Sequence, residues 1–199
     1  MTMHREKITE TILLWLSFAA TLTVLCGLIH LAVQQDLRQS ANDPQIQMAE
    51  DAASKLAAGV SPEMIVPQNT SVDIVSSLSP YLMVFNDAGQ PIAGSGILNG
   101  QPLMPPPGVF DYAKSHGEDR ITWQPQPYVR QAAVIMHYAG AQTTGFVMAG
   151  RSLREVEIRE NQLEFEVGAA WIFGLFITLI TTAIYIYKKE LIGRFSSRQ

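Results

Sequence analysis

The sequence is poor in residues that hold metal ions or form cross-links. Its single cysteine, Cys26, cannot form an intrachain disulfide. Cys26 follows Leu25 inside an apolar run, whereas lipidated bacterial cysteines follow a small residue, so we interpret it as a packing residue. The histidines do not have the spacing of metal ligands, and they are His4, His30, His116 and His137. We therefore expect no metal site and no cofactor.

Catalytic motifs are also missing. The chain has no Ser/His/Asp order, no activated cysteine, no phosphate-binding glycine loop and no paired carboxylates at a recognised spacing. The acidic residues that follow the first apolar run do not match a calcium-binding loop, and they are Asp36, Asp43, Glu50 and Asp51. We predict that this protein is not an enzyme.

Charge is absent from two long stretches, Ile12–Val33 and Gly168–Tyr187. Each contains no Asp, Glu, Lys or Arg and is long enough to cross the roughly 30 Å hydrocarbon core of a bilayer. The first stretch exceeds the apolar core of a signal peptide, which has about 7–15 residues. The sequence therefore predicts two transmembrane helices, with the lipid bilayer as a partner.

The short tails set the expected orientation. Both carry basic residues, namely Arg5, Lys7, Lys188, Lys189, Arg194 and Arg198, and positively charged flanks stay in the cytoplasm. This divides the chain into a cytoplasmic tail (1–11), a first span (12–33), an extracytoplasmic domain (34–167), a second span (168–187) and a cytoplasmic tail (188–199). The exterior segment holds 8 of the 14 basic and 15 of the 18 acidic residues, and this negative charge argues against nucleic-acid binding.

The exterior segment has the patterning of an α+β domain. A helix is predicted over Pro44–Ala58, because its apolar residues recur on one face and Gly59 ends the pattern. A short helix is expected over Val109–Ser115. Ser71–Ser79 fits either a short helix or a loop, and the glycines and prolines between Gly94 and Gly108 indicate a loop. About five strands are predicted, at Tyr81–Asn86, Pro91–Ser95, Arg120–Trp123, Val129–Tyr138 and Thr144–Gly150.

The segment after the last strand predicts a helix that continues into the second span. Ser152 and Glu155 have the spacing of a capping box, and Glu155 stands four residues before Arg159, in the favourable order for an ion pair. One helical stripe contains Leu153, Val156, Glu160 and Leu163. This helix either transmits a signal from the domain to the membrane or acts as a passive stalk. The polar Glu160 within the stripe is consistent with a homodimer, since a buried polar position can set register.

Four segments carry a resemblance to a known family: Ala41–Gln45, Tyr81–Pro91, Ile121–Pro125 and Gly145–Glu157. Together with the element order they resemble the extracytoplasmic Cache and PAS-like sensor domains of bacterial histidine kinases, chemoreceptors and cyclic-di-nucleotide enzymes. The resemblance implies a single α+β domain, an antiparallel sheet of about five strands with long N- and C-terminal helices, in the bacterial inner membrane. Such receptors continue into a cytoplasmic output region, whereas 12 residues follow Tyr187 here. We therefore expect signalling through a separately encoded partner, such as a histidine kinase of a two-component system.

Four residues are candidates for binding a small-molecule ligand: Trp123, Tyr128, Arg130 and Tyr138. Arg130 stands among apolar strand residues, where a guanidinium can clamp a carboxylate, or it can form an ordinary salt bridge. The aromatic residues either line a pocket or belong to the core.

Two functions remain open on the sequence alone. The first is a sensory or signal-input protein that detects a small solute or an envelope partner. The second is a non-sensory accessory subunit that docks onto a larger membrane complex. A sensor requires a cavity with converging polar groups, whereas a docking module requires an exposed apolar patch and a filled interior.

Overall fold

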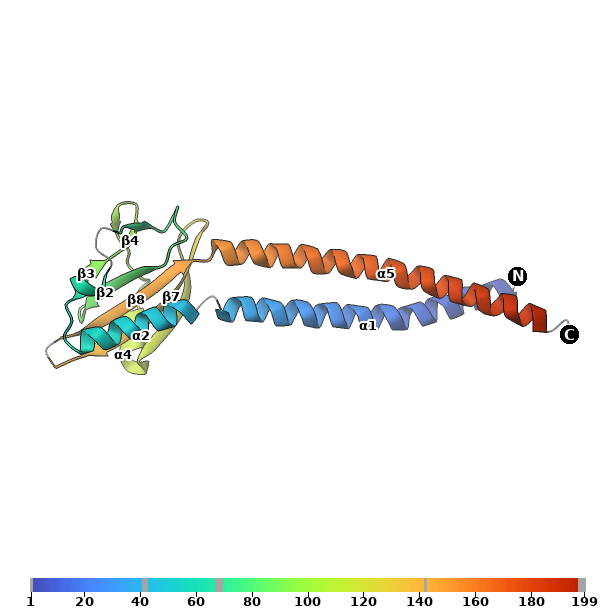
Figure 1. The fold of residues 1–199 in the computed structure, drawn as a ribbon, viewed down its shortest axis with the longest axis horizontal. Coiled ribbons are helices and arrows are strands. Elements are labelled where there is room, and N and C mark those ends of the chain that lie inside the picture. The colour runs from blue at the N-terminus through green and yellow to red at the C-terminus, as the bar shows by residue number, and fades with distance from the viewer. Residues whose placement is uncertain (1, 41–42, 67–69, 142, 197–199) are drawn as a thin grey trace. The chain divides into compact units, whose positions relative to one another are not determined.

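The computed structural model describes residues 2–40, 43–66, 70–141 and 143–196. It consists of two compact units, one formed by Asp36–Arg159 and one by Met1–Gln35 with Glu160–Gln199 (Figure 1). Part of the resembling segment Ala41–Gln45, Gln142 between the last two predicted strands and the last three residues lie outside the described residues.

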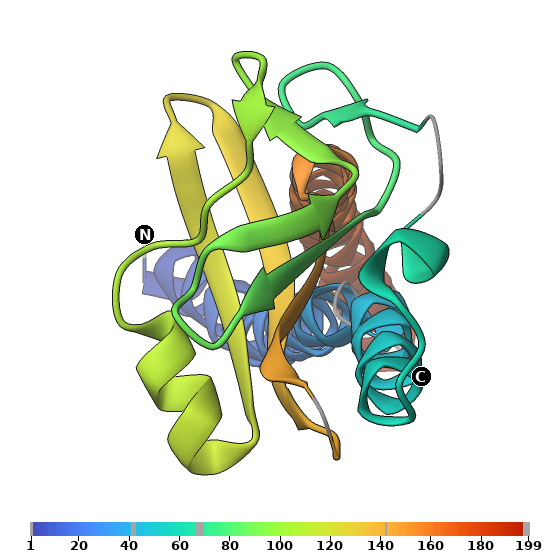
Figure 2. The same ribbon diagram turned by 90° about the vertical axis from the view of Figure 1, so that its left-hand side faces the viewer.

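The centre of the first unit is a five-stranded antiparallel sheet of order β3-β2-β8-β7-β6 (Figure 2). Its strands are β2 (Tyr81–Asn86), β3 (Pro91–Gly94), β6 (Glu118–Gln126), β7 (Val129–Ala139) and β8 (Thr144–Ser152). The predicted α+β fold class and all five strands are confirmed. β8 pairs along its whole length with residues 131–139 of β7, and this places the start of the last helix beside the start of β7.

Helix α2 (Asp43–Ala57), followed by the short α3 (Pro62–Ile65), covers one face of this sheet. Its buried alanines and Leu56 pack against alternate residues of the strands, among them Val134, Tyr138 and Val147. Small residues at these positions let the helix backbone approach the sheet closely. The predicted helix over Pro44–Ala58 is confirmed to within one residue at each end.

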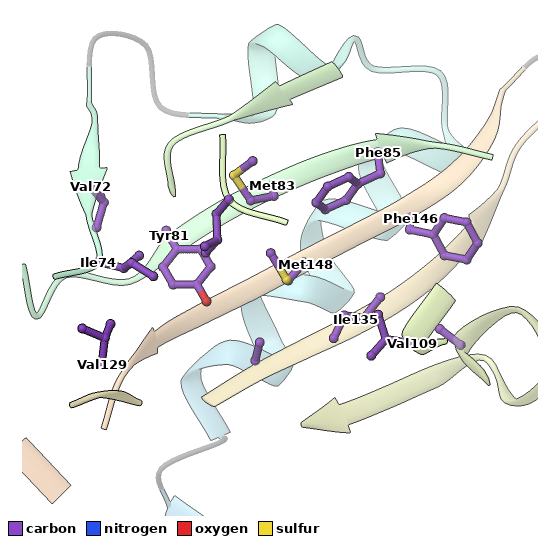
Figure 3. Packing of buried hydrophobic residues seen from close by; sticks show 13 residues of the cluster. Val72, Ile74, Tyr81, Met83, Phe85, Val109, Val129, Ile135, Phe146 and Met148 are labelled. Atoms are coloured by element: carbon purple, nitrogen blue, oxygen red, sulfur yellow. The ribbon is translucent and has the colours of Figure 1, made fainter. Parts of the chain in front are cut away.

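Helix α4 (Val109–His116) lies on the opposite face of the sheet, with a second core beneath it (Figures 2 and 3). Phe110 packs its ring against Phe85 and Phe146, with centroids 5.0 and 4.8 Å apart. Gly117, at φ +90°, ends the helix, and its N–H donates to the carbonyl of Ala113. Large side chains from β2, β7 and β8 fill this core.

A small second sheet joins β1 (Val72–Asp73), β4 (Gly96–Leu98) and β5 (Gln101–Pro102) in the order β1-β4-β5. The expectation of an uninterrupted loop between Gly94 and Gly108 was therefore wrong, and Ser71–Ser79 contains a strand, not a helix. These strands have two or three residues, which is too short for an alternating pattern to appear in the sequence.

Helix α5 (Arg154–Ser196) begins directly after β8. The predicted capping box does not form, because Ser152 is the last strand residue and its hydroxyl accepts a hydrogen bond from the N–H of Arg154 at 3.3 Å. Glu155 pairs with Arg159, as predicted, and not with the helix start. Leu153 and Val156 form a small buried cluster with Ala132 of β7.

The second unit contains most of α1 (Thr2–Ser40) and the remainder of α5. Ile8–Leu37 and Arg154–Lys189 are long and apolar enough to cross a membrane, judged by length and composition. Within this unit the indole N–H of Trp15 donates to the carbonyl of Leu175 at 3.2 Å, and that of Trp171 donates to the hydroxyl of Thr23 at 2.9 Å. The two helices thus form a pair with polar contacts between them.

Candidate functional site

The four predicted ligand-binding residues do not come together. Trp123 packs against the core beneath α4, whereas Tyr138 belongs to the core beneath α2, on the other face of the sheet. Arg130 stands at the opposite end of β7 from Tyr138, and its guanidinium pairs with Glu157 at 2.7 Å. Tyr128 is 95% exposed at the β6–β7 turn, with φ +66°. Of these residues, Tyr138 alone lines the large cavity described next.

A cavity of about 890 Å³ lies at the end of the sheet where α2 ends. Three chain segments form its walls: residues 56–62, the β2–β3 turn and the β7–β8 turn. Its apolar lining comes mainly from the end of α2 and Ile92, and polar lining comes from Asn86, Asp87, Tyr138, Thr143 and Thr144. A volume of this size accommodates a small molecule.

The end of α2 forms the first wall. Gly59, at φ +89°, reverses the chain, its N–H bonds the carbonyl of Leu56, and the N–H of Val60 bonds the carbonyl of Lys55, both at 3.0 Å. This is the hydrogen-bond pattern of a Schellman cap, which glycine favours because it adopts a positive φ without strain. The negative end of the helix dipole therefore lies at the cavity.

The β2–β3 turn forms the second wall and places Asp87 at the cavity. Asn86 closes the turn, because its side-chain oxygen accepts a hydrogen bond from the N–H of Gln90 at 2.8 Å. Gly89 allows Phe110 of α4 to rest on the turn, since a Cβ at this position would lie 2.9 Å from the Phe110 ring. The turn is thus fixed both by its own hydrogen bonds and by α4.

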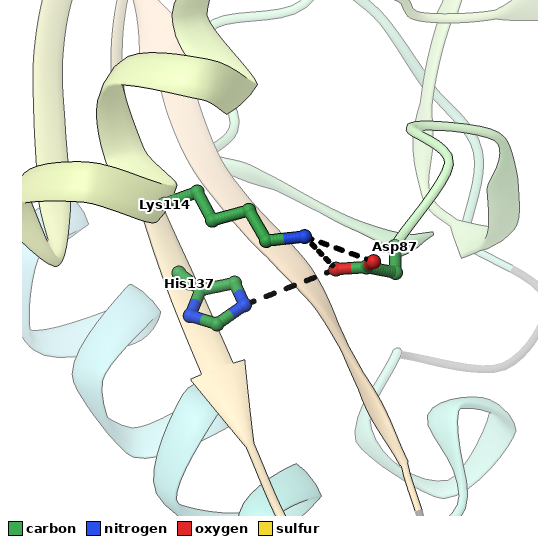
Figure 4. A network of polar contacts seen from close by, with 3 residues as sticks. All are labelled: Asp87, Lys114 and His137. Atoms are coloured by element: carbon green, nitrogen blue, oxygen red, sulfur yellow. Dashed lines mark hydrogen bonds and ion pairs between the residues drawn. The ribbon is translucent and has the colours of Figure 1, made fainter.

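Asp87 is the centre of a polar network that joins the turn to α4 and β7 (Figure 4). The Lys114 ammonium contacts its two carboxylate oxygens at 2.8 and 2.9 Å, and His137 Nε2 lies 4.0 Å from Oδ1. The hydrogen bonds from Lys114 lower the pKa of the Asp87 carboxyl below its ordinary value, with a smaller contribution from His137. Asp87 is therefore a carboxylate across the physiological pH range.

The β7–β8 turn and Tyr138 form the third wall. Gly140 packs directly on the end of α2, where a Cβ would lie 2.6 Å from the carbonyl oxygen of Ala57. The phenol of Tyr138 lies over Gly145, where a Cβ would stand 2.9 Å from its hydroxyl. Burial raises the pKa of Tyr138 above its ordinary value, so the phenol is a neutral hydrogen-bonding group. Two glycines thus bring the helix, the hairpin and an aromatic hydroxyl to one place.

A second polar cluster lies inside the core beneath α4. The hydroxyl of Tyr81, Nε1 of Trp123 and Oε1 of Gln131 are buried without a hydrogen-bond partner among the described residues. Trp123 and Gln131 are directly paired across β6 and β7. Burial raises the pKa of Tyr81 well above its ordinary value, and the nearby indole N–H partly offsets this without reaching hydrogen-bonding geometry. Trp123 therefore belongs to a buried cluster and not to the cavity.

The residues predicted to transmit a signal lie at the start of α5. Leu153 and Val156 are buried against β7, Glu155 is exposed, and Glu160 and Leu163 are half-buried beyond the domain boundary. Arg130 joins this segment to the sheet, because it pairs with Glu157 and its carbonyl accepts the N–H of Leu153 at 3.0 Å. Of the two interpretations of Arg130, the salt bridge is the one that matches its contact with Glu157.

Sequence reasoning missed Asp87 as a site residue. The segment Asn86–Gly89 has the composition of a turn, and turn chemistry alone explains an Asp there. Its partner Lys114 stands 27 residues later, and nothing in the sequence shows that α4 packs beside this turn. The end of α2 at Gly59 was visible in the sequence, but its approach to Gly140 was not.

No protein-family model matches the chain, and no curated protein matches it. Among solved structures, the chain is similar to the ligand-binding domain of the amino acid chemoreceptor PctC of Pseudomonas aeruginosa PAO1, in complex with GABA. The match covers 73% of this chain and 67% of that chain, at 16% sequence identity and a TM-score of 0.47. GABA is the ligand of that protein.

Proposed function

We propose that this protein is a sensory subunit of the bacterial inner membrane, whose extracytoplasmic domain binds a small solute in the cavity at the end of α2. The N and C termini are cytoplasmic, and the signal passes through α5 to a separately encoded partner such as a histidine kinase. The chain acts as a homodimer or together with another membrane protein. It has no catalytic role.

The cavity is the observation that carries this proposal. A sensor must enclose a solute and must link the binding site to an element that leaves the domain. The cavity has about 890 Å³, polar groups from three segments and a wall made by the end of α2. β7 and β8 run from the cavity hairpin to the start of α5, where Leu153 and Val156 pack on Ala132. A shift of the hairpin therefore has a direct route to α5.

The accessory-subunit alternative is favoured by one observation, the 95% exposed side chain of Tyr128. A non-glycine residue at φ +66° carries backbone strain, and its aromatic ring contributes little to packing in the domain. An exposed, strained aromatic residue at a hairpin tip is consistent with a contact to another protein.

A ligand screen on the full-length protein in lipid nanodiscs tests the sensor proposal. Thermal unfolding is followed by scanning calorimetry in the presence of small acids, amines, sugars and divalent ions. A ligand that binds only the folded state at a hundred times its Kd stabilises it by about 2.7 kcal/mol. We expect Ala88→Trp, which fills the cavity, to abolish the shift, and Ala139→Trp, outside the lining, to retain it.

The result also decides between the two functions. A stabilising ligand that Ala88→Trp leaves unaffected would place the binding site elsewhere in the domain. A screen without any stabilising compound, combined with loss of a co-purifying membrane protein in Tyr128→Ala, would favour the accessory subunit.

A further inference from the structure

We infer that the cavity selects a cationic ligand, an organic amine, which replaces Lys114 as the partner of Asp87. This inference rests on the proposed function of the cavity as a ligand site. It names the chemical class of the solute and the contact that the solute changes.

The first step is the charge of the cavity wall. Among its described lining residues Asp87 is the one charged side chain, and no Lys, Arg or His is present. The C-terminal end of α2 adds the negative end of a helix dipole, equivalent to roughly half an elementary charge. The remaining polar lining consists of hydroxyl groups and the amide of Asn86. An anion therefore finds no compensating charge in this wall, whereas a cation finds a carboxylate and a helix end.

The second step is the exchange at Asp87. Lys114 reaches the carboxylate from α4, and the two side chains are 50% and 48% exposed. Ion pairs at such exposed positions contribute little to stability, because water screens both charges. A ligand ammonium makes the same charge-assisted hydrogen bonds from inside the cavity, where it is also surrounded by apolar groups. The carboxylate stays ionised throughout, because its pKa is lowered.

The third step is the consequence for α4. Lys114 and Phe110 are one helical turn apart, so the ion pair and the Phe110–Gly89 contact hold the same face of α4 on the β2–β3 turn. His137 Nε2 lies 4.0 Å from Oδ1 of the same carboxylate. Release of Lys114 loosens α4 from the turn and leaves the aromatic contact in place. The ligand thus changes a contact on the face of the sheet opposite α2.

Three probes of equal chain length separate the ligand classes in the full-length protein in nanodiscs. These are 1,4-diaminobutane, butanedioate and 1,4-butanediol, and binding is measured by calorimetry and by thermal shift. We expect the diamine to bind most tightly. Asp87→Asn is expected to weaken it at least about 10-fold, the factor for loss of a charged hydrogen bond. Asp87→Glu is expected to retain binding, which controls for folding.

The decisive variant is Lys114→Met. If a ligand amine displaces Lys114, removal of this competitor tightens diamine binding about 2- to 5-fold, the factor for an exposed ion pair. Lys55→Met, which removes a cation at the last turn of α2, controls for the general change in charge and should have a smaller effect. Weaker diamine binding in Lys114→Met would overturn the exchange.

The experiment keeps this inference distinct from the proposed function. Tighter binding of butanedioate, weakened by Lys114→Met, would overturn the amine class and leave the cavity as a sensor site for anions. Tighter binding of the diol, or equal diamine binding in the wild type and Asp87→Asn, would overturn the role of the carboxylate. Absence of binding by all three probes would overturn the inference, and the broader screen with Ala88→Trp would still test the sensor function.

Discussion

At the scale of single residues, Asp87 combines two roles, because it lines the cavity and also links the β2–β3 turn to α4. Water alone can solvate a carboxylate in a turn. The two hydrogen bonds that Lys114 donates to Asp87 are therefore not needed to form the turn. The ion pair is exposed and contributes modestly to stability. A ligand can therefore replace Lys114 in this ion pair without a large loss of fold stability.

The lowered pKa of Asp87 predicts a specific pH dependence. A carboxyl whose pKa is lower in the folded state than in the unfolded state stabilises the fold above its unfolded pKa of about 3.9. This stabilisation is lost as the pH falls through the folded pKa. We expect the melting temperature of the wild type to fall more steeply below about pH 4 than that of Asp87→Asn.

Thermal unfolding between pH 2 and pH 6 measures this difference. Asp51→Asn, at an exposed position of α2, provides the matched control and should follow the wild type. Parallel curves for the wild type and Asp87→Asn would show that the Lys114 contact does not persist in solution.

At the scale of elements, the start of α5 is attached to the sheet by two kinds of contact. Leu153 and Val156 are buried against Ala132, and Arg130 pairs with Glu157 across the surface at 2.7 Å. The apolar contact fixes the position of the helix, whereas the ion pair, with side chains 46% and 35% exposed, adds little energy.

A double-mutant cycle on Arg130→Ala and Glu157→Ala tests the assignment of Arg130. We expect a coupling energy of about 0.2–1 kcal/mol by thermal or chemical unfolding, typical of an exposed ion pair. Ligand binding in the cavity should be unchanged in Arg130→Ala, because this residue lies at the other end of β7. Loss of ligand binding in Arg130→Ala would instead restore the carboxylate-clamp interpretation, and Glu157→Ala would then retain binding.

The elements that the sequence predicted well are those whose pattern is long and local. The five main strands alternate or form apolar runs, and α2 carries small residues on one face with Gly59 at its end. The sheet of β1, β4 and β5 was missed because its strands are too short to show a period. The capping box at Ser152 failed because β7 extends the strand: Gln131 pairs with Ser152. Tertiary pairing thus overrode a local signal.

The candidate site was less predictable than the fold, for a physical reason. Trp123 and Tyr138 were predicted either to line a pocket or to belong to the core, but side chains of a sheet alternate between faces. Trp123 faces the core beneath α4 and Tyr138 faces α2, so the pair cannot share one pocket. The cavity instead depends on how two turns and a helix end meet, and these contacts join residues far apart in the sequence, such as Ala57 and Gly140.

At the scale of the whole molecule, the proposed function requires the domain to lie outside the cytoplasm. The two long helices suit a membrane by length and composition, and the basic residues of the tails favour cytoplasmic termini. The negative charge of the exterior segment adds a consistent feature, since it attracts cations toward the cavity. Orientation and ligand class are thus linked through the distribution of charge along the chain.

Labelling with a membrane-impermeant maleimide tests this orientation. Cys26→Ser removes the single cysteine and allows single-cysteine variants to be read without background. Tyr128→Cys, at a position that is 95% exposed in the domain, should react in intact spheroplasts. Lys189→Cys, after the second apolar run, should react only once the membrane is permeabilised. The opposite result would place the cavity in the cytoplasm, where the solute it meets and the partner it signals to would both have to be cytoplasmic.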